Sequence, residues 1–249
     1  MSAPFETIPA MRDTPLFIFG DHASKHIPAQ MNGLGLSGDD LTRHIAWDIG
    51  TETIIRSLCA HFGCAGQLAG VSRLVIDLNR EPDHAGLIPE SSDGTLVPAN
   101  QGLSDAQRQS RIDQFYTPYH TALAATLDGM DDPFVLSVHS FTPKPDLGEW
   151  RMVEVGLLVK HDERSAKQLR QMFMHLGRAF TLGMNEPYSA YDLNYTVDAH
   201  LAPRGLRHIA IEIRQDLIDT ATKAEDIAGV LAGCLEPLVN RAHITLIEP

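Results

Sequence analysis

The sequence predicts an α/β protein with a largely parallel β-sheet, and three short apolar runs support that prediction. Each run stops at a polar cluster: LFIF precedes Asp21 and His22, FVLSV precedes His139, and HIAI precedes Glu212 and Arg214. A run that ends this way is typical of a buried parallel strand that meets its loop. Helical patterns separate the runs, which favours a parallel sheet. Ligands of such sheets bind beyond the carboxyl ends of the strands, so we expect a site at that edge.

In the first half of the chain, the pattern predicts two strands, one helix and one long loop. Residues 16–19 are the first strand, and a helix capped by Ser37 or Asp39 continues to Gly63 because apolar residues recur there near a 3.6 period. Residues 74–78 are the second strand. Residues 81–100 are rich in Pro, Gly, Asp and Ser, and loops of such length are usually functional, so we expect a lid or rim of the site.

The second half predicts three more strands and three helices. Ser104 caps a long helix, which Pro118 should kink or divide because proline lacks the backbone N–H. The remaining predicted elements are strands at 133–141, 152–160 and 206–216, an irregular excursion at 142–150, a helix from 163 that ends near Gly183, and a last helix at 222–243.

The composition argues against two classes of protein. A formal net charge of -12 does not provide the basic surface that binding to nucleic acid needs. No apolar run reaches the roughly 20 residues of a membrane-spanning helix, and the N-terminal segment lacks the basic start and apolar core of a signal peptide. We expect one domain over residues 1–249, a monomer or small homo-oligomer, and a cytoplasmic protein in which Cys59, Cys64 and Cys234 are buried thiols.

His22 and His139 are the best candidates for metal ligands, because each follows an apolar run directly and lies in polar sequence. Neutral imidazole is a common zinc ligand, and a catalytic zinc site takes three protein ligands and keeps one position open. The third ligand is either Asp48, in HIAWDIG, or Asp21. Lys25 stands where the short-spaced HxxE arrangement would need a glutamate. Asp48 could instead be an exposed or helix-pairing acid.

Glu212 alternates with isoleucines in its predicted strand. It lies either on a solvated face or in the site, where it would take a proton from water and return it to a leaving amine. Arg214, two residues on, shares its face and could pair with Glu212 or bind a substrate carboxylate.

Two further segments contain candidate binding residues. RLVIDLNR concentrates Arg73, Asp77, Asn79 and Arg80, and arginine matches a carboxylate with its planar fork, although a charged strand border would look the same. GMNEPYSAYD holds Asn185, Tyr188 and Tyr191, which could line a pocket or simply form a turn.

Taken together and in order, GDHASKHIP, HIAWDIG, SRLVIDLNREP, PYH, SVHSFTP, NEPYS and IEIRQDLI resemble the N-formylglutamate amidohydrolase family. The resemblance extends from Leu16 to Ile218. It implies a three-layer α/β/α sandwich on a mostly parallel mixed sheet, a phosphorylase/hydrolase-like fold similar to zinc carboxypeptidases and aspartoacylase. It also implies hydrolysis of the formyl amide of N-formyl-L-glutamate or a related N-acyl amino acid to formate and the free amino acid, a reaction of histidine catabolism.

The resemblance also implies roles for individual residues. His22, Asp48 and His139 would hold Zn²⁺ or another divalent metal. Glu212 would be the general base, and Arg80 would stabilise the oxyanion or anchor the substrate carboxylate. The further substrate-binding candidates are Arg73, Asn79, Arg214, Asn185 and Tyr188.

A second hypothesis from another class is a non-catalytic protein that keeps the hydrolase fold and binds a small acid. The presence of the metal trio together with Glu212 favours the enzyme, because a binding module would not need a base beside a metal.

Overall fold

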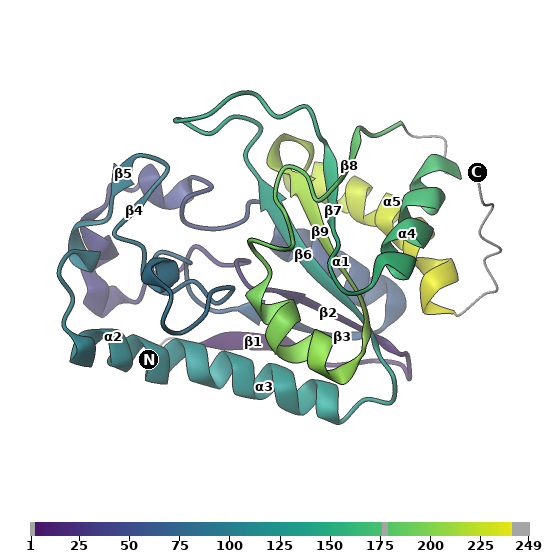
Figure 1. Cartoon of the computed structure of the whole chain (residues 1–249), viewed down its shortest axis with the longest axis horizontal. Helices are drawn as coiled ribbons and strands as arrows, with labels where there is room; N and C mark the ends of the chain where they lie inside the picture. The colour runs from purple at the N-terminus through teal and green to yellow at the C-terminus, as the bar shows by residue number, and fades with distance from the viewer. Residues whose placement is uncertain (1–2, 176–178, 241–249) are drawn as a thin grey trace.

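A mixed β-sheet lies at the centre of the protein (Figure 1). The computed structural model describes residues 3–175 and 179–240, and within these ranges seven strands pair in the order β1-β3-β2-β6-β9-β7-β8. The neighbours β3, β2, β6 and β9 are parallel, β1 is antiparallel to β3, and β7 is antiparallel to β9. The strands are β1 (Phe5–Ile8), β2 (Leu16–Gly20), β3 (Ala65–Ala69), β6 (Phe134–Phe141), β7 (Val155–Leu158), β8 (Leu182–Met184) and β9 (Arg207–Arg214).

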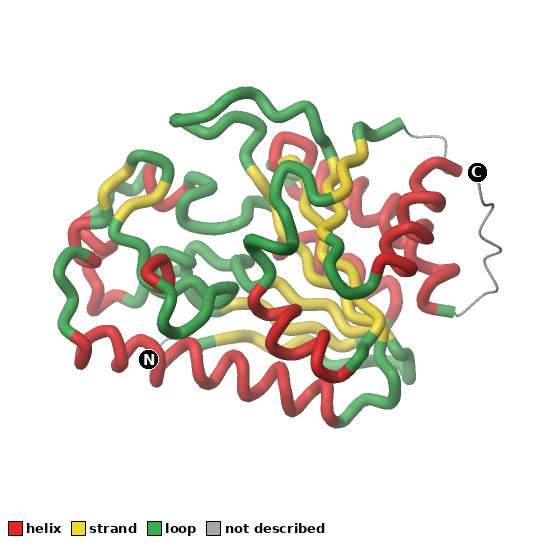
Figure 2. Tube along the Cα trace, viewed as in Figure 1, coloured by secondary structure: helices red, strands yellow, loops and turns green. Residues whose placement is uncertain are grey.

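Helices cover both faces of this sheet, which makes three layers (Figures 1 and 2). Alternate residues of β2 show the division. Leu16 and Ile18 pack in the cluster that includes helices α1 (Thr51–Phe62), α4 (Glu163–His175) and α5 (Ala221–Val239). Phe17 and Phe19 pack on the other face with α3 (Thr117–Asp128) and the helical turn Val197–Leu201. The predicted α/β/α fold on a mostly parallel mixed sheet is confirmed.

The predicted strands that end in polar clusters are confirmed as β2, β6 and β9. All eight residues of β6 are buried, because helices cover both faces of the sheet there. The predicted strand at 152–160 is β7, with narrower bounds.

The predicted helix from residues 37–39 to 63 is wrong in its first part. The helix α1 begins only at Thr51, after Gly50, whose φ is +84°. A side chain at Gly50 would collide with the carbonyl oxygen of Ile218, so only glycine fits this turn. The preceding segment holds a short 3₁₀ turn, Asp40–Thr42, and then a loop. Asp48 therefore lies on a loop and not on a helix face.

The predicted strand at 74–78 is also wrong. These residues form a buried turn packed in a second apolar cluster with Leu34, Ile45 and Val97. The sheet position next to β2 belongs to β3, whose sequence AGQLA has no long apolar run. Gly66 of β3 allows close packing, since a side chain there would meet the Cys59 sulfur.

Residues 81–128 contain more short elements than the sequence predicts. Residues 81–100 hold 3₁₀ turns at Ala85–Leu87 and Pro98–Asn100 and a small hairpin of β4 (Ser91–Ser92) and β5 (Thr95–Leu96). Ser104 caps α2 (Asp105–Arg111) in a capping box with Gln107. The predicted long helix is not divided in two: a π-helical turn, Ile112–Tyr116, joins α2 to α3 just before Pro118, and the residues at both junctions keep helical backbone angles.

Two predicted helix ends differ from the structure. Gly183, expected near the end of a helix, lies in β8, after α4 and residues outside the described ranges. The last helix, α5, runs to Val239, and its predicted end at residue 243 lies outside the described residues. The three cysteines are free and buried, as predicted.

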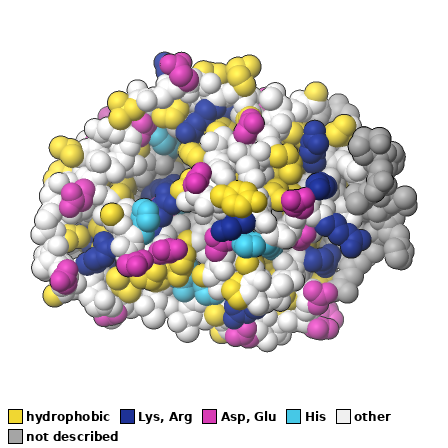
Figure 3. All heavy atoms as spheres, in the orientation of Figure 1, with side chains coloured by type: hydrophobic (Ala, Val, Ile, Leu, Met, Phe, Trp, Pro, Cys, Tyr) yellow, Lys and Arg dark blue, Asp and Glu magenta, His cyan; other side chains and the backbone are white. Residues whose placement is uncertain are grey.

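The surface charges and the lengths of the helices relate to the binding of nucleic acid and of membranes. On the face drawn in Figure 3, acidic and basic side chains are interspersed. Of the helices in the described ranges, none is both long and apolar enough to cross a bilayer.

Candidate active site

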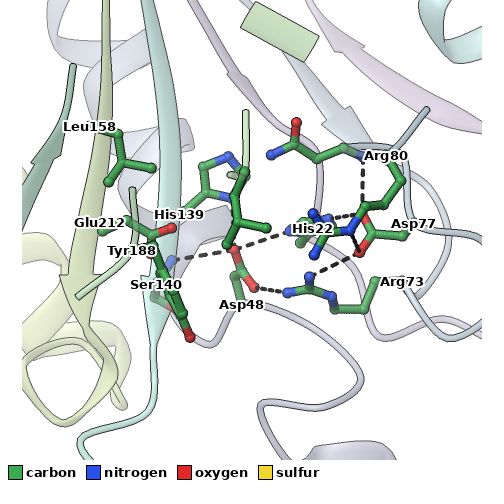
Figure 4. A pocket seen from close by; sticks show the side chains of 12 residues that line it. His22, Asp48, Arg73, Asp77, Arg80, His139, Ser140, Leu158, Tyr188 and Glu212 are labelled. Atoms are coloured by element: carbon green, nitrogen blue, oxygen red, sulfur yellow. Dashed lines mark hydrogen bonds and ion pairs between the residues drawn. The ribbon is translucent and has the colours of Figure 1, made fainter. Parts of the chain in front are cut away.

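The ends of β2, β6 and β9 bring the expected residues into one cavity of about 160 Å³ (Figure 4). Asp21 and His22 follow β2 directly, and His139 of β6 is the parallel register partner of Glu212 of β9. Parallel pairing of β2, β6 and β9 places their ends at the same edge of the sheet. The volume is smaller than the roughly 300–1,000 Å³ of sites for drug-sized ligands, so the cavity suits a small substrate.

His22, Asp48 and His139 form a group whose potential ligand atoms all lie within 4.8 Å of one another. Asp48 Oδ2 is 3.0 Å from His139 Nδ1 and 3.5 Å from His22 Nδ1. His22 Nδ1 is buried and has no hydrogen-bond partner. Two imidazoles and one carboxylate are a donor set that suits a catalytic zinc ion with an open position, and a metal would supply the missing partner of His22 Nδ1. The three residues therefore fit a metal.

The loop that holds Asp48 is tied to the end of β2. The Asp48 backbone N–H donates to the His22 carbonyl at 2.9 Å, and the Ser140 N–H donates to Asp48 Oδ2 at 3.3 Å. These bonds explain how residues distant in sequence come to share one site.

Asp21, the other candidate for a third ligand, lies behind His139. Its Oδ2 is 3.7 Å from His139 Nε2, the ring nitrogen opposite to the one that faces Asp48. Its Oδ1 accepts a hydrogen bond from the Tyr119 hydroxyl at 2.8 Å. Burial raises the pKa of the Asp21 carboxyl. The structure thus brings Asp48, and not Asp21, between the two histidines.

In each histidine, Nε2, the ring nitrogen that faces away from Asp48, has a partner of its own. His22 Nε2 donates to Asp77 Oδ1 at 2.7 Å, and His139 Nε2 lies 3.0 Å from Ser137 Oγ. Such partners orient an imidazole and leave the other nitrogen directed at a metal. Both histidines therefore direct Nδ1 toward the centre of the trio.

Nearby charges change the pKa values of the trio. Burial and nearby Arg73 lower the pKa of His22, but Asp77 and Asp48 outweigh them and raise it to about 9. Burial raises the pKa of Asp48, but His22, His139 and Arg73 outweigh it, so Asp48 is held below its ordinary value. The histidine protons would have to leave when a cation binds.

Glu212 faces the same cavity from β9. It is buried, and its Oε2 has no hydrogen-bond partner. Burial raises the pKa of Glu212 to about 7, although the neighbouring His139 acts in the opposite direction. A carboxyl with this pKa can both accept and release a proton near neutral pH.

The turn 73–80 provides the other side of the cavity. Arg73 donates to Asp77 Oδ2 at 2.9 Å and to Asp48 Oδ1 at 3.3 Å, so its guanidinium is already paired. Among the described residues, the carboxylate that comes within 4.0 Å of the Arg80 guanidinium is that of Asp77, whose Oδ2 lies 4.0 Å from Arg80 Nε. Asn79 accepts the Thr196 N–H through Oδ1. Arg73, Asn79 and Arg80 all line the cavity.

The other three predicted binding residues differ in position. Tyr188 lines the cavity, and its hydroxyl accepts a hydrogen bond from Arg151 at 2.9 Å. Arg214 is outside the lining and donates to Asp216 and to the carbonyls of residues 151 and 152. Asn185, with φ +54°, is also outside the lining and hydrogen-bonds the backbone of Val159, so it holds a turn.

Sequence reasoning missed several lining or supporting residues. It considered Asp77 only as a partner of an arginine, and it gave Ser137 no role. Ser140 directly follows His139, which could have suggested it, whereas no sequence signal indicates that Leu158 and Leu193 also line the cavity.

Comparisons with known proteins identify the family of this chain. The family model described as N-formylglutamate amidohydrolase matches residues 14–219. No curated protein matches the chain. Among solved structures, the gene product Atu2144 of Agrobacterium tumefaciens is 31% identical with a TM-score of 0.90, and the match covers 97% of each chain. N-formylglutamate amidohydrolase from Ralstonia eutropha JMP134 is 20% identical with a TM-score of 0.72, over 96% of this chain and 99% of the other. The match over most of its length means that this chain belongs to the N-formylglutamate amidohydrolase family, a family of amide hydrolases.

Proposed function

We propose that this protein is a metal-dependent amidohydrolase that removes the formyl group, or another short acyl group, from N-formyl-L-glutamate or a related N-acyl amino acid. The observation that supports it is one small buried cavity in which the His22, Asp48 and His139 trio, the unpartnered Glu212 and the guanidinium of Arg80 all face the same space. The products would be formate, or the matching carboxylic acid, and the free amino acid.

His22, Asp48 and His139 would hold the metal, for which zinc is the first choice because the donors are two imidazoles and a carboxylate. When bound, zinc supplies a Lewis acid that makes water more acidic and polarises an amide carbonyl. Asp77 and Ser137 would keep the two imidazoles in the required orientation.

Glu212 would move the proton. Its raised pKa, near 7 through burial, suits a group that takes a proton from the attacking water and gives it to the amide nitrogen as the C–N bond breaks. Its register pairing with His139 keeps the Glu212 backbone next to one member of the trio.

Asn79 and Arg80 would bind the α-carboxylate of the substrate. Arg80 has no hydrogen bond to a carboxylate within the described ranges, whereas Arg73 is paired with Asp48 and Asp77. A carboxylate can accept two parallel hydrogen bonds from a free guanidinium. On this chain, whose net charge is -12, a local cation of this kind is needed to attract an anionic substrate.

The test is formate release from N-formyl amino acids by zinc-loaded protein, together with its metal content. The wild type should bind one divalent ion and release formate, and Glu212→Gln should keep the metal and lose roughly 10²–10⁴-fold in kcat/KM. A wild type that binds no divalent metal and releases no formate would remove the enzyme hypothesis and leave the binding protein. A Glu212→Gln variant with wild-type kcat/KM would remove Glu212 as the base.

Three wider predictions accompany the proposal. We infer that residues 1–249 fold as one domain, that the protein acts in the cytoplasm, and that it is a monomer or small homo-oligomer. The free, buried cysteines are compatible with a reducing compartment.

A further inference from the structure

The charges around the cavity are unevenly distributed. Three carboxylates line it, those of Asp48, Asp77 and Glu212, together with the guanidiniums of Arg73 and Arg80 and the two imidazoles that would hold the metal. Arg73 is hydrogen-bonded to two of these carboxylates. Among the lining residues in the described part of the chain, Arg80 is therefore the one guanidinium without a hydrogen bond to a carboxylate, and it can receive a carboxylate from a substrate.

Two other arginines near the cavity, Arg151 and Arg214, do not add a guanidinium to its lining. Arg151 lies behind the ring of Tyr188, 4.8 Å from its centroid, and donates to the Tyr188 hydroxyl and to the Thr142 carbonyl. Arg214 donates to Asp216. Neither arginine lines the cavity.

Part of the remaining wall is apolar. Leu158, at the end of β7, and Leu193, in the loop after β8, line the cavity together with the ring of Tyr188. In Figure 4, Leu158, Tyr188 and Glu212 lie on one side, and Arg80 lies on the other. A substrate whose amide faces the trio and whose α-carboxylate faces Arg80 would direct its side chain at this wall.

We infer that the substrate has an apolar, uncharged side chain, so that its α-carboxylate is the only anionic group it brings into the site. This inference rests on the proposed amidohydrolase function and narrows its substrate class. A second carboxylate, as in N-formylglutamate, would lose its hydration without an unpaired guanidinium to receive it, and it would lie on the same side as Glu212, whose Oε2 has no hydrogen-bond partner.

The test compares four substrates with the zinc-loaded full-length protein: N-formyl-L-leucine, N-formyl-L-methionine, N-formyl-L-glutamine and N-formyl-L-glutamate. Glutamine and glutamate have nearly the same shape, so this pair isolates the effect of the charge. The kcat/KM for formate release should be at least about 10-fold higher with leucine or methionine than with glutamate, and glutamine should lie between them.

A pair of variants at the apolar wall sharpens the test. Leu193 is half-buried, so it can be replaced by a longer side chain. Leu193→Arg supplies a second cation and should raise the glutamate-to-leucine ratio of kcat/KM by about 10-fold or more. Leu193→Met, which is similar in volume and uncharged, should keep the leucine preference.

The outcomes separate this inference from the proposed function. Equal or better cleavage of N-formylglutamate than of N-formyl-leucine by the wild type overturns the inference and leaves the amidohydrolase function intact. Loss of that glutamate activity in Arg151→Gln would then identify Arg151 as the second anchor. Cleavage of none of the four substrates overturns the proposed function, and the inference with it.

Discussion

The two sides of the cavity are held in position by different means. His139 and Glu212 lie on the neighbouring strands β6 and β9, whose ladder places them side by side (Figure 4). The opposite side is the segment 71–80, which contains no helix or strand although its apolar residues are fully buried. Its backbone carbonyls accept hydrogen bonds from side chains far away in the sequence: Asn100 to Leu74, Arg111 to Val75, His120 to Leu78, and Tyr116 to Arg80.

This difference shows which residues each side depends on. A strand ladder is formed by backbone groups, so a change of side chain at His139 or Glu212 should leave the ladder in place. A buried turn has no ladder, and its carbonyls lose their partners when a single supporting side chain is removed. Substitution of Glu212 should therefore affect chemistry alone, whereas substitutions on the turn side should also affect stability and, through Asp77, metal binding.

Asp48→Ala should give the largest effect, because Asp48 lies between the two histidines at the junction of both sides. We expect zinc affinity to fall by more than about 100-fold, beyond the 10–100-fold that outer partners of a ligand usually contribute. Competition with a zinc-binding dye measures this affinity. Full zinc retention in the variant would remove Asp48 from the ligand set.

Asp77→Asn tests the turn side and Glu212→Gln tests the strand side with the same change of acid to amide. Asp77 orients His22 through a 2.7 Å contact, so Asp77→Asn should weaken zinc binding by about 10–100-fold. Glu212 does not contact His22 and should leave zinc affinity nearly unchanged in Glu212→Gln. Calorimetric titration with zinc compares the two variants. Equal losses in both would contradict the proposed division of roles.

Asn100→Ala should destabilise the fold through the turn. The Asn100 amide donates to the carbonyls of Leu74 and Pro89 and accepts from the buried Arg111. Groups left buried without partners should lower the free energy of unfolding by about 2 kcal/mol. Gln101→Ala is the matched control, because this exposed amide also donates to carbonyls but at the surface. Urea denaturation that gives the same small loss for both would show that the turn does not depend on Asn100.

His120→Gln should remove part of the pH dependence of stability. Burial, with a smaller effect of His200, lowers the pKa of His120 to about 3, and the unfolded value is about 6.5. The folded state therefore keeps His120 neutral, and its contribution is complete above pH 6.5 and is lost as the pH falls from 6.5 toward 3. Between pH 8 and pH 5, the wild type should lose up to about 2 kcal/mol more stability than the variant. Parallel stability curves would exclude this contribution.

The sequence was informative for the strand side of the site and misleading for the turn side. LFIF, FVLSV and HIAI form strands because their apolar character fits a position covered on both faces. RLVIDLNR has the same character, yet it forms a turn, because Asn100, Arg111 and His120 satisfy its backbone away from the sheet. Apolar content predicts burial in both cases, but it does not distinguish a ladder from a network of side chains.

The sequence by itself therefore determined the α/β class, the three strand ends and the roles expected for His22, His139 and Glu212, because these depend on local patterns. Only the tertiary structure decided that Asp48, on a loop ended by Gly50, lies between the two histidines. It also decided that Arg80 has only a 4.0 Å ion pair with Asp77 among the described residues, whereas Arg73 is hydrogen-bonded to two carboxylates, and that Leu193 lines the cavity. These positions depend on hydrogen bonds and contacts between segments far apart in the chain, which no local pattern records.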